Sequence, residues 1–363
     1  MKKKINPMTR KSFITYGLLL IVFTAVEIMV NTGSISSMLK GLLVPICIYS
    51  ILAVSLNLTV GILGELSLGQ AGFMCIGAYS SAIFSNLVKD TITQPLIRFP
   101  LAILVGGIFA ALFGILIGIP VLRLRGDYLA IVTLAFGEII KNVFAALYIG
   151  YDSAGLHISL KSQGDLGLAA DGKMIINGAL GISGTPNDST FEIAAAILFI
   201  SVIICYNFVN SRTGRAVMSI RDNRIAAESV GLNITKYKLI TFGLTAFLAG
   251  VAGVLYSHNY YSLQASKFDY NLSILVLVFV VLGGIGSIRG SVIAAIVLTL
   301  LPEMLRSISN YRMLMYAIVL IVMMICTSNA TIRNFFVRNF EKLKGLIIKK
   351  KPAGETETAK EGE

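Results

Sequence analysis

The chain has 363 residues, of which 55% are apolar and only 14% are charged, and its mean hydropathy is +0.79. A soluble domain of this length would not carry repeated apolar runs of about 20 residues, so the composition excludes a soluble protein and predicts a polytopic α-helical membrane protein. The net charge of +12 does not indicate a nucleic-acid partner, because the lysines and arginines flank apolar spans instead of forming one patch.

Hydropathy predicts about ten transmembrane helices, each near the length that a bilayer core demands. In chain order they are Phe13–Val30, Leu42–Val60, Leu68–Val88, Leu101–Leu122, Tyr128–Ile149, Phe191–Asn210, Leu239–Ser257, Leu272–Ile288, Ser291–Ile308 and Met313–Thr327. The assignment of the last three helices stays open, because Gly283–Gly290 fits a re-entrant break as well as a tight turn. The spans form a transmembrane domain at residues 13–330, between a basic N-terminus at 1–12 and a tail at 331–363 that is first basic and then disordered.

The distribution of basic residues predicts the orientation. With the N-terminus in the cytoplasm, most of the 31 lysines and arginines fall in cytoplasmic segments, as the positive-inside bias requires. An even number of spans then places both termini in the cytoplasm. The segment at residues 150–190 is external and too long for a simple connection, so it forms either a functional surface or a disordered loop.

The stretch Gly61–Tyr79, G-I-L-G-E-L-S-L-G-Q-A-G-F-M-C-I-G-A-Y, places glycines at intervals of about four residues. Small residues at this spacing let helix backbones approach closely, so Gly69 and Gly77 are predicted helix-packing positions. Ser67 and Gln70 are the polar residues of the same stretch, and we expect them to line a translocation path.

The stretch Leu122–Ile140 supplies the next candidates. Thr133, Gly137 and Lys141 recur at intervals of four on one helix face, which predicts Thr133 as a path residue and Gly137 as a packing residue. Glu138 lies three residues before Lys141 and can pair with it along the helix. Ionisable groups inside a span are functional candidates, so Glu138 is a further path candidate, and an ion pair at the surface is the alternative.

The stretch Val280–Gly290, V-V-L-G-G-I-G-S-I-R-G, resembles a phosphate loop but lacks its Gly-Lys-Ser/Thr, a tripeptide that occurs nowhere in the sequence. Gly283 and Gly284 therefore favour a tight turn or a close helix crossing.

Residues that would carry other chemistry are isolated. His157 and His258 have no neighbours at a metal-binding spacing, so no metal site is predicted. The four cysteines lie far apart inside apolar spans and are predicted to be packing residues: Cys47, Cys75, Cys205 and Cys326. No nucleophile stands at a recognisable spacing from a base, which indicates that the chain is not an enzyme.

The longest charged stretch after the N-terminus is Ser211–Lys238, between two apolar spans. Helical spacing predicts a short helix with an apolar side and a polar side: Ala216, Val217 and Ile220 on the first, and Arg215, Ser219, Asp222 and Arg224 on the second. Asn223 is placed to cap a second short helix, Ile225–Val230, which Gly231 would end. By the positive-inside bias this stretch is cytoplasmic. It either transmits movement from a soluble partner to the membrane helices or is an amphipathic loop on the membrane surface.

Five ordered blocks together resemble the permease subunits of bacterial ABC importers for branched-chain amino acids. They are Gly64–Tyr79 (G-E-L-S-L-G-Q-A-G-F-M-C-I-G-A-Y), Leu122–Leu134 (L-R-L-R-G-D-Y-L-A-I-V-T-L), Gly178–Pro186 (G-A-L-G-I-S-G-T-P), Arg212–Gly231 (R-T-G-R-A-V-M-S-I-R-D-N-R-I-A-A-E-S-V-G) and Leu282–Gly290 (L-G-G-I-G-S-I-R-G). The blocks cover most of the chain from about Leu42 to Thr327. The second and fourth discriminate best from nucleoside and sugar relatives.

The resemblance implies a permease-type helix bundle in the bacterial inner membrane. It also implies three kinds of protein partner besides membrane lipid: a sister permease subunit, two cytoplasmic ATPase subunits and an external solute-binding protein. ATP and magnesium would be bound by the ATPase subunits, with no cofactor on this chain. The implied coupling-loop residues are Arg215, Ser219, Arg221, Asp222, Ala226, Ala227 and Gly231. ABC importers widely show Glu-Ala-Ala-x-x-x-Gly in this loop, and here Ile225 occupies the acidic position.

Three alternatives stay open. An ion-coupled secondary carrier would need a carboxylate near the bilayer midplane, for which Glu138 is the candidate. An ABC permease for a nucleoside, urea or a sugar would use the same architecture. A structural membrane scaffold would leave the glycine-rich helices and the basic loop without a role.

Overall fold

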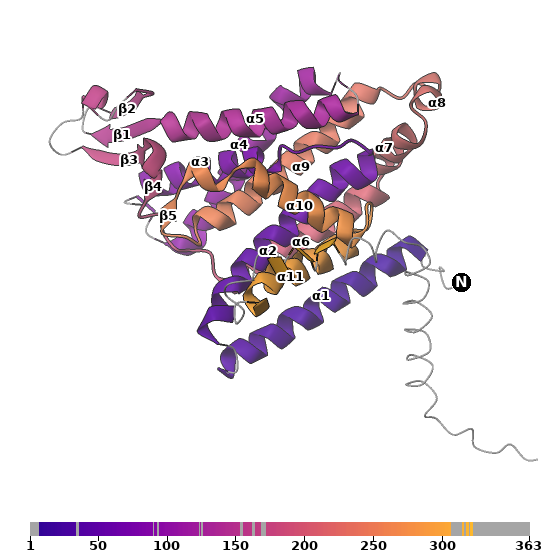
Figure 1. The fold of residues 1–363 in the computed structure, drawn as a ribbon, viewed down its shortest axis with the longest axis horizontal. Coiled ribbons are helices and arrows are strands. Elements are labelled where there is room, and N and C mark those ends of the chain that lie inside the picture. The colour runs from indigo at the N-terminus through magenta and orange to yellow at the C-terminus, as the bar shows by residue number, and fades with distance from the viewer. Residues whose placement is uncertain are drawn as a thin grey trace, which may run out of the picture. The chain divides into compact units, whose positions relative to one another are not determined.

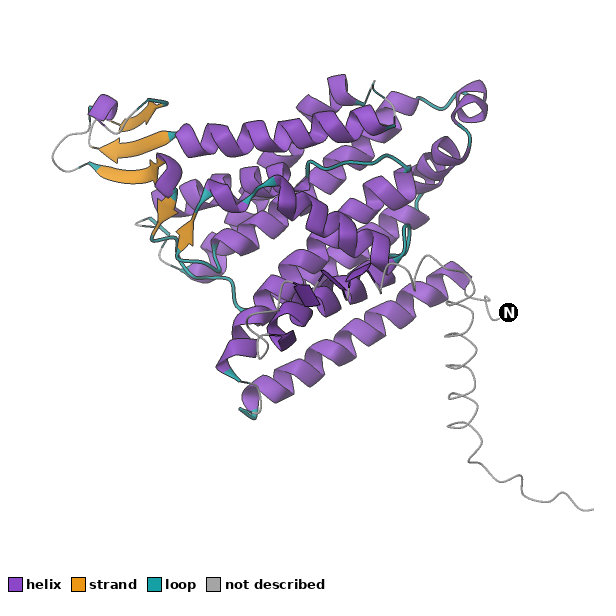
Figure 2. Cartoon of the chain, viewed as in Figure 1, coloured by secondary structure: helices purple, strands orange, loops and turns teal. Residues whose placement is uncertain are grey.

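The computed structural model describes residues 7–33, 36–89, 91–92, 94–122, 124, 126–152, 155–161, 164–167, 172–305, 314–315, 317–318 and 320–321. Helices dominate this part of the chain (Figures 1 and 2). They are α1 (Pro7–Asn31), α2 (Ser37–Asn57), the π-helix η1 (Leu58–Leu63), α3 (Gln70–Val88), α4 (Pro95–Val121), α5 (Asp127–Ala146), α6 (Phe191–Asn210), α7 (Arg212–Asp222), α8 (Arg224–Ser229), α9 (Ile234–Ser257), α10 (Tyr270–Gly283) and α11 (Ile288–Met304).

Seven helical segments in the described residues are long and apolar enough to cross a bilayer. They are Ser37–Leu63, Gln70–Val88, Pro95–Val121, Asp127–Ala146, Phe191–Asn210, Ile234–Ser257 and Ala265–Gly283. The predicted count of about ten is not confirmed. The apolar part of α1, Thr15–Val30, and the 17-residue α11 are shorter, and most of the predicted span Met313–Thr327 lies outside the described residues. The tail at 331–363 lies outside them entirely.

The prediction of an all-α protein is wrong in the segment that follows α5. Three antiparallel strands form a sheet in the order β2-β1-β3: β1 (Tyr148–Asp152), β2 (Gly155–Ser159) and β3 (Lys173–Asn177). A second pair joins β4 (Ile182–Ser183) to β5 (Ser262–Leu263). Isoleucine and tyrosine recur along these strands, and such side chains fit a pleated, half-buried surface. The described part of residues 150–190 is therefore folded, and its role as a functional surface stays a prediction.

Helices α2, α3 and α9 contain more buried residues than the other helices, and glycines set their separation. A Cβ on Gly77 of α3 would lie 2.4 Å from the Cα of Gly250 on α9, and a Cβ on Gly283 would lie 2.4 Å from the carbonyl carbon of Gly290. The backbones touch at these points, which is how small residues associate helices where lipid offers no hydrophobic driving force. Gly72 of α3 faces Gly137 of α5: a Cβ on Gly72 would lie 2.8 Å from the Gly137 Cα, whereas a Cβ on Gly137 would keep 3.7 Å from Gly72.

Other side chains follow the same division between core and surface. Cys47, Cys75 and Cys205 are free and buried, which confirms their predicted packing role, and Cys326 lies outside the described residues. Apolar side chains are exposed along α4, with Leu96 at 87% and Leu116 at 65%. A bilayer or another membrane subunit is the environment in which such a surface is stable.

The two ends of the bundle differ in character. Helices α7 and α8 lie at one end, and strands β1–β3 lie at the other, joined to the bundle through α5 (Figure 1). The predicted cytoplasmic loop and the predicted external segment therefore lie at opposite ends of the same helices.

The contact between Gly77 and Gly250 leads to a test of packing. A Gly77→Val variant must push α3 away from α9, so we expect the free energy of unfolding to be lower by about 1–3 kcal/mol or more. The measurement is the thermal unfolding midpoint of the detergent-solubilised protein. Gly41→Val is the matched control, since a Cβ at Gly41 meets no atom within 4 Å. Equal midpoints for the two variants would contradict the packing role.

Candidate functional site

The helical structure is interrupted between the candidate spans Ser37–Leu63 and Gln70–Val88, and this interruption collects polar groups. Helix α2 continues into η1 and ends at Gly64, whose φ of +80° is the left-handed conformation that glycine adopts without strain. Residues 65–69 are not helical, and α3 begins at Gln70. Non-helical backbone at membrane depth is stable only where protein or a water-filled cavity surrounds it.

Hydroxyl groups from other helices satisfy the backbone of this interruption. The Leu68 N–H donates to Thr133 Oγ1 of α5 at 2.9 Å, and the Ala71 N–H donates to Ser273 Oγ of α10 at 3.1 Å. The Gly69 N–H reaches Ser67 Oγ at 3.5 Å. These contacts hold an extended segment between two helices, as in the broken helices of transporters.

The predicted path residues Ser67, Gln70 and Thr133 thus come together around one segment. All three are buried, and Gln70 Oε1 accepts a hydrogen bond from Ser55 Oγ of α2 at 3.4 Å. Beside them Asn57 binds two partners, because its Nδ2 donates to Ser291 Oγ at 2.9 Å and its Oδ1 accepts from the Gly286 N–H at 2.8 Å. The result is a buried polar cluster inside an otherwise apolar bundle.

Glu138 lies apart from this cluster. It follows Thr133 by five positions on α5, forms an ion pair with Lys141 and accepts the Tyr270 N–H at 2.9 Å. Its carboxylate therefore holds the first turn of α10, in addition to the predicted pairing along the helix. The pairing of Glu138 with Lys141 is confirmed.

The stretch at 211–238 folds as two short helices followed by α9. Ser211 caps α7, Asn223 caps α8 by accepting the Ala226 N–H at 3.0 Å, and Asn233 caps α9. Gly231, with a φ of +84°, follows the end of α8. The cap at Asn223 and the stop at Gly231 agree with the sequence analysis.

The predicted coupling-loop residues divide between an exposed face and a packed face. Arg215, Ser219, Asp222, Ala226 and Gly231 are exposed. Ala227 is buried against Ile220 and Ile234. Two apolar side chains are strongly exposed, Ile225 at 81% and Val230 at 76%. The sequence analysis did not predict this exposure. Together with their polar neighbours they form a surface that we call the α8 surface, made of Ile225, Ala226, Ser229, Val230 and Gly231.

The side chain of Arg221 is 39% exposed, but its guanidinium also contacts η1. Its Nη1 donates to the Gly61 carbonyl of η1 at 2.8 Å, and its Nε and Nη2 donate to Asp222 Oδ1 at 3.1 and 2.9 Å. Nearby, Lys238 of α9 is only 3% exposed and forms an ion pair with Glu65. Sequence reasoning did not find these contacts. The one available signal was a lysine at the start of an apolar span, where an unpaired charge is costly.

The end that carries the strands is closed by a second set of polar contacts. Arg98 of α4 pairs with Asp188 at 2.7 Å, and both side chains are at most 10% exposed. His258, expected in an outside loop without a partner, is instead buried at the end of α9, where it bonds Ser85 at 2.8 Å. Burial lowers the pKa of the His258 imidazole, so the neutral form is favoured.

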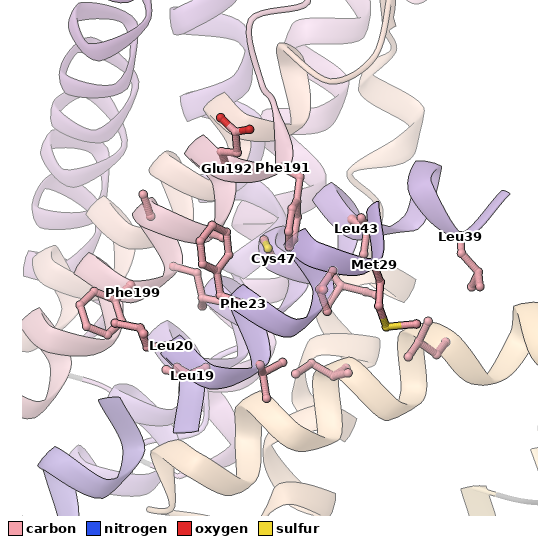
Figure 3. A pocket seen from close by; sticks show the side chains of 18 residues that line it. Leu19, Leu20, Phe23, Met29, Leu39, Leu43, Cys47, Phe191, Glu192 and Phe199 are labelled. Atoms are coloured by element: carbon pink, nitrogen blue, oxygen red, sulfur yellow. The ribbon is translucent and has the colours of Figure 1, made fainter. Parts of the chain in front are cut away.

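An apolar cavity of about 560 Å³ lies between α1, α2, α6 and α11 (Figure 3). Phe23, Met29, Cys47 and Phe199 contribute to its wall, and Glu192 is the one carboxylate among the lining residues. This lining suits hydrocarbon and offers almost nothing to a charged or zwitterionic solute. The polar cluster at the helix interruption is therefore the better candidate for a solute path. Among the described residues no group of three metal-ligating side chains gathers.

The helices are of bilayer length, the helical structure is interrupted between two of them, and a capped pair of helices lies at one end. This arrangement is typical of a multi-pass membrane transport subunit. A sequence profile described as "Branched-chain amino acid transport system / permease component" matches residues 38–327. The chain belongs to this permease family. No solved structure matches the chain.

Individual relatives agree with the profile. The chain is 32% identical over 336 residues to the high-affinity branched-chain amino acid transport system permease protein LivM of Salmonella typhimurium, covering 88% of this chain and 75% of that protein. LivM of Escherichia coli matches with the same identity and coverage. The nucleoside ABC transporter permease protein NupC of Lactococcus lactis is 25% identical over 206 residues, which is 53% of this chain and 59% of that protein.

The hydrogen bond between Thr133 and the Leu68 N–H leads to a test of the interruption. Thr133→Val keeps the shape of the side chain but leaves the Leu68 N–H without a partner. We therefore expect the free energy of unfolding to be lower by about 1–3 kcal/mol. Thr133→Ser keeps the hydroxyl and is the matched control. The measurement is the thermal unfolding midpoint in detergent. A valine variant as stable as the serine variant would show that Thr133 does not support this segment.

Proposed function

We propose that this chain is the membrane-spanning permease subunit of an ATP-driven importer that moves branched-chain aliphatic amino acids delivered by an external binding protein. The observation that carries the proposal is the family match over residues 38–327, joined by 32% identity to two permeases named for branched-chain amino acids. The printed names concern those relatives, and the substrate is carried over to this chain as part of the proposal.

The proposed assembly contains a sister permease subunit, two ATPase subunits that bind ATP and magnesium, and the binding protein. It resides in the bacterial inner membrane. The α7–α8 end faces the cytoplasm with both termini, and the strands β1–β3 face outward. The basic character of residues 211–238 supports this orientation, since lysine and arginine concentrate in cytoplasmic loops.

The α8 surface is the proposed contact for an ATPase subunit. Ile225 and Val230 are apolar, exposed and held on a helix that Asn223 caps. Exposed apolar anchors surrounded by polar residues are typical of protein interfaces. The isoleucine at the acidic position of the family pattern changes the chemistry of this contact, so apolar burial replaces the expected salt bridge. Arg215, Ser219 and Asp222 extend the surface along α7.

The proposed solute path passes the helix interruption. Ser67, Gln70 and Thr133 offer a few polar groups among small and apolar ones, which suits a zwitterion with an aliphatic side chain. The permease needs little affinity of its own, because the binding protein supplies the solute and ATP-driven closure of the partners shifts the population of inward- and outward-facing states.

A second candidate is an ABC permease for a nucleoside or a sugar, and weaker similarity to such permeases favours it. The chain matches the nucleoside permease NupC and, at 28% identity over 124 residues, the fructose import permease protein FruG of Bifidobacterium longum. Both matches have lower identity and cover less of the chain than the LivM matches.

Uptake by the whole complex tests the substrate and the energy source together. We expect vesicles that contain the complex to accumulate leucine only with ATP and the binding protein, and unlabelled isoleucine or valine to compete where adenosine, urea and ribose do not. Competition by adenosine or ribose alone would favour the second candidate. Uptake by this chain without partners, driven by a proton or sodium gradient, would establish an ion-coupled carrier instead.

An Ile225→Asp substitution tests the α8 surface. Burying a carboxylate in an apolar contact costs about 2 kcal/mol or more, so we expect co-purification of the ATPase subunits to fall at least about tenfold. Leu160→Asp, at an exposed position beyond β2, is the matched control for membrane insertion and should leave co-purification unchanged. Normal recovery of ATPase with Ile225→Asp would place the contact elsewhere.

A further inference from the structure

Two contacts join the α7–α9 region to the interruption after η1. The first is the ion pair between Lys238 and Glu65, whose side chains are 4% and 16% exposed. The second is the hydrogen bond from Arg221 Nη1 to the Gly61 carbonyl at 2.8 Å. The partners are 173 and 160 positions apart in the sequence, so they connect separate parts of the bundle and not neighbouring turns.

The arrangement around Arg221 fixes where its guanidinium points. Asp222 accepts from Nε and Nη2, which leaves Nη1 to meet the Gly61 carbonyl. Gly64 provides the space for the arginine side chain, because a Cβ there would lie 2.6 Å from Arg221 Cγ. Arg221 therefore contacts the membrane helix, although its side chain is 39% exposed and that of Asp222 is 66% exposed.

We propose that Glu65, Lys238 and Arg221 are positioning residues that transmit the movement of the α7–α8 pair to the helix interruption; the inference rests on the proposed function of this chain. Glu65 and Lys238 form an ion pair between the two regions, and the Arg221 guanidinium forms a charge-assisted hydrogen bond to the Gly61 carbonyl. Neither contact touches the solute or the nucleotide.

The geometry explains how a small displacement reaches the solute path. Glu65 is two residues before Ser67 and three before Leu68, and residues 65–69 are not helical. This segment has no regular helical hydrogen bonding: the Glu65 N–H donates to the Thr59 carbonyl of η1 at 3.1 Å, and the Leu68 N–H is held by a single hydroxyl, Thr133 Oγ1. A shift of Lys238 with α9 must carry Glu65 along, because separating a buried pair leaves an uncompensated charge in a low dielectric.

The proposal predicts that removing these contacts uncouples ATP hydrolysis from solute uptake. The ATPase subunits would still dock on the α8 surface and hydrolyse ATP, while the interruption would no longer follow their movement. The two activities would therefore separate, with uptake falling and ATP hydrolysis per complex remaining. A residue with a purely structural role would lower both together with the amount of assembled complex.

Charge exchange tests the ion pair. In the whole reconstituted complex, we expect Glu65→Lys and Lys238→Glu each to lower ATP-dependent uptake at least about tenfold, and the double exchange to restore most of it. Lys236→Glu is the matched control, since Lys236 is exposed two positions earlier on α9 and should leave uptake unchanged. Single variants that transport normally, or a well-assembled double variant that fails to recover, would overturn the proposal.

A second variant keeps the test decisive if the single reversals do not assemble. Replacing both members by methionine, Glu65→Met with Lys238→Met, removes the pair without leaving a lone buried charge, so assembly should survive. We expect this variant to hydrolyse ATP at close to the rate of the unaltered complex while its uptake falls. Unchanged uptake would overturn the proposed coupling. Absence of ATP-dependent uptake in the unaltered complex would instead overturn the proposed function.

Discussion

The structure depends on one constraint, which is that polar backbone inside a bilayer must find partners within the protein. At residues 65–69 the chain leaves the helical conformation, and the Leu68 N–H finds its acceptor on another helix. Thr133 of α5 supplies that acceptor, and Ser273 of α10 supplies one for the Ala71 N–H in the first turn of α3. Three separate helices are thereby fixed around one extended segment, and this is what creates a polar environment in the middle of an apolar bundle.

The same constraint explains why the basic end of the bundle is not merely a charged surface. Of the cations at 211–238, Arg221 and Lys238 face the membrane helices and bind Gly61 and Glu65, whereas Arg215 faces solvent. The inward cations serve the carbonyl and the carboxylate that the interruption exposes. The outward residues and the apolar Ile225 and Val230 remain available to a partner.

Much of the architecture follows from local sequence patterns. The bounds of α6 agree with the hydropathy prediction, and Asn223 and Gly231 delimit α8 because capping and left-handed glycine act within a few residues. The strands at 148–177 were missed because short strands produce a weak periodic signal beside long apolar helices. The bonds of Asn57 to Ser291 and of Lys238 to Glu65 were missed because they join residues more than 170 positions apart. Helical periodicity carries no information on such distant pairs.

Glu138 shows why an ionisable group inside a span does not by itself identify an energy source. A carboxylate that couples transport to an ion gradient must exchange its partner during each cycle. Glu138 instead has a lysine one turn away and a backbone N–H at the start of α10, so releasing it would cost a salt bridge and expose an unsatisfied helix terminus. Its position favours a fixed role in holding α5 to α10. This fixed role favours the proposed ATP-driven importer over an ion-coupled carrier, and the exposed α8 surface is where we propose that an ATPase subunit acts.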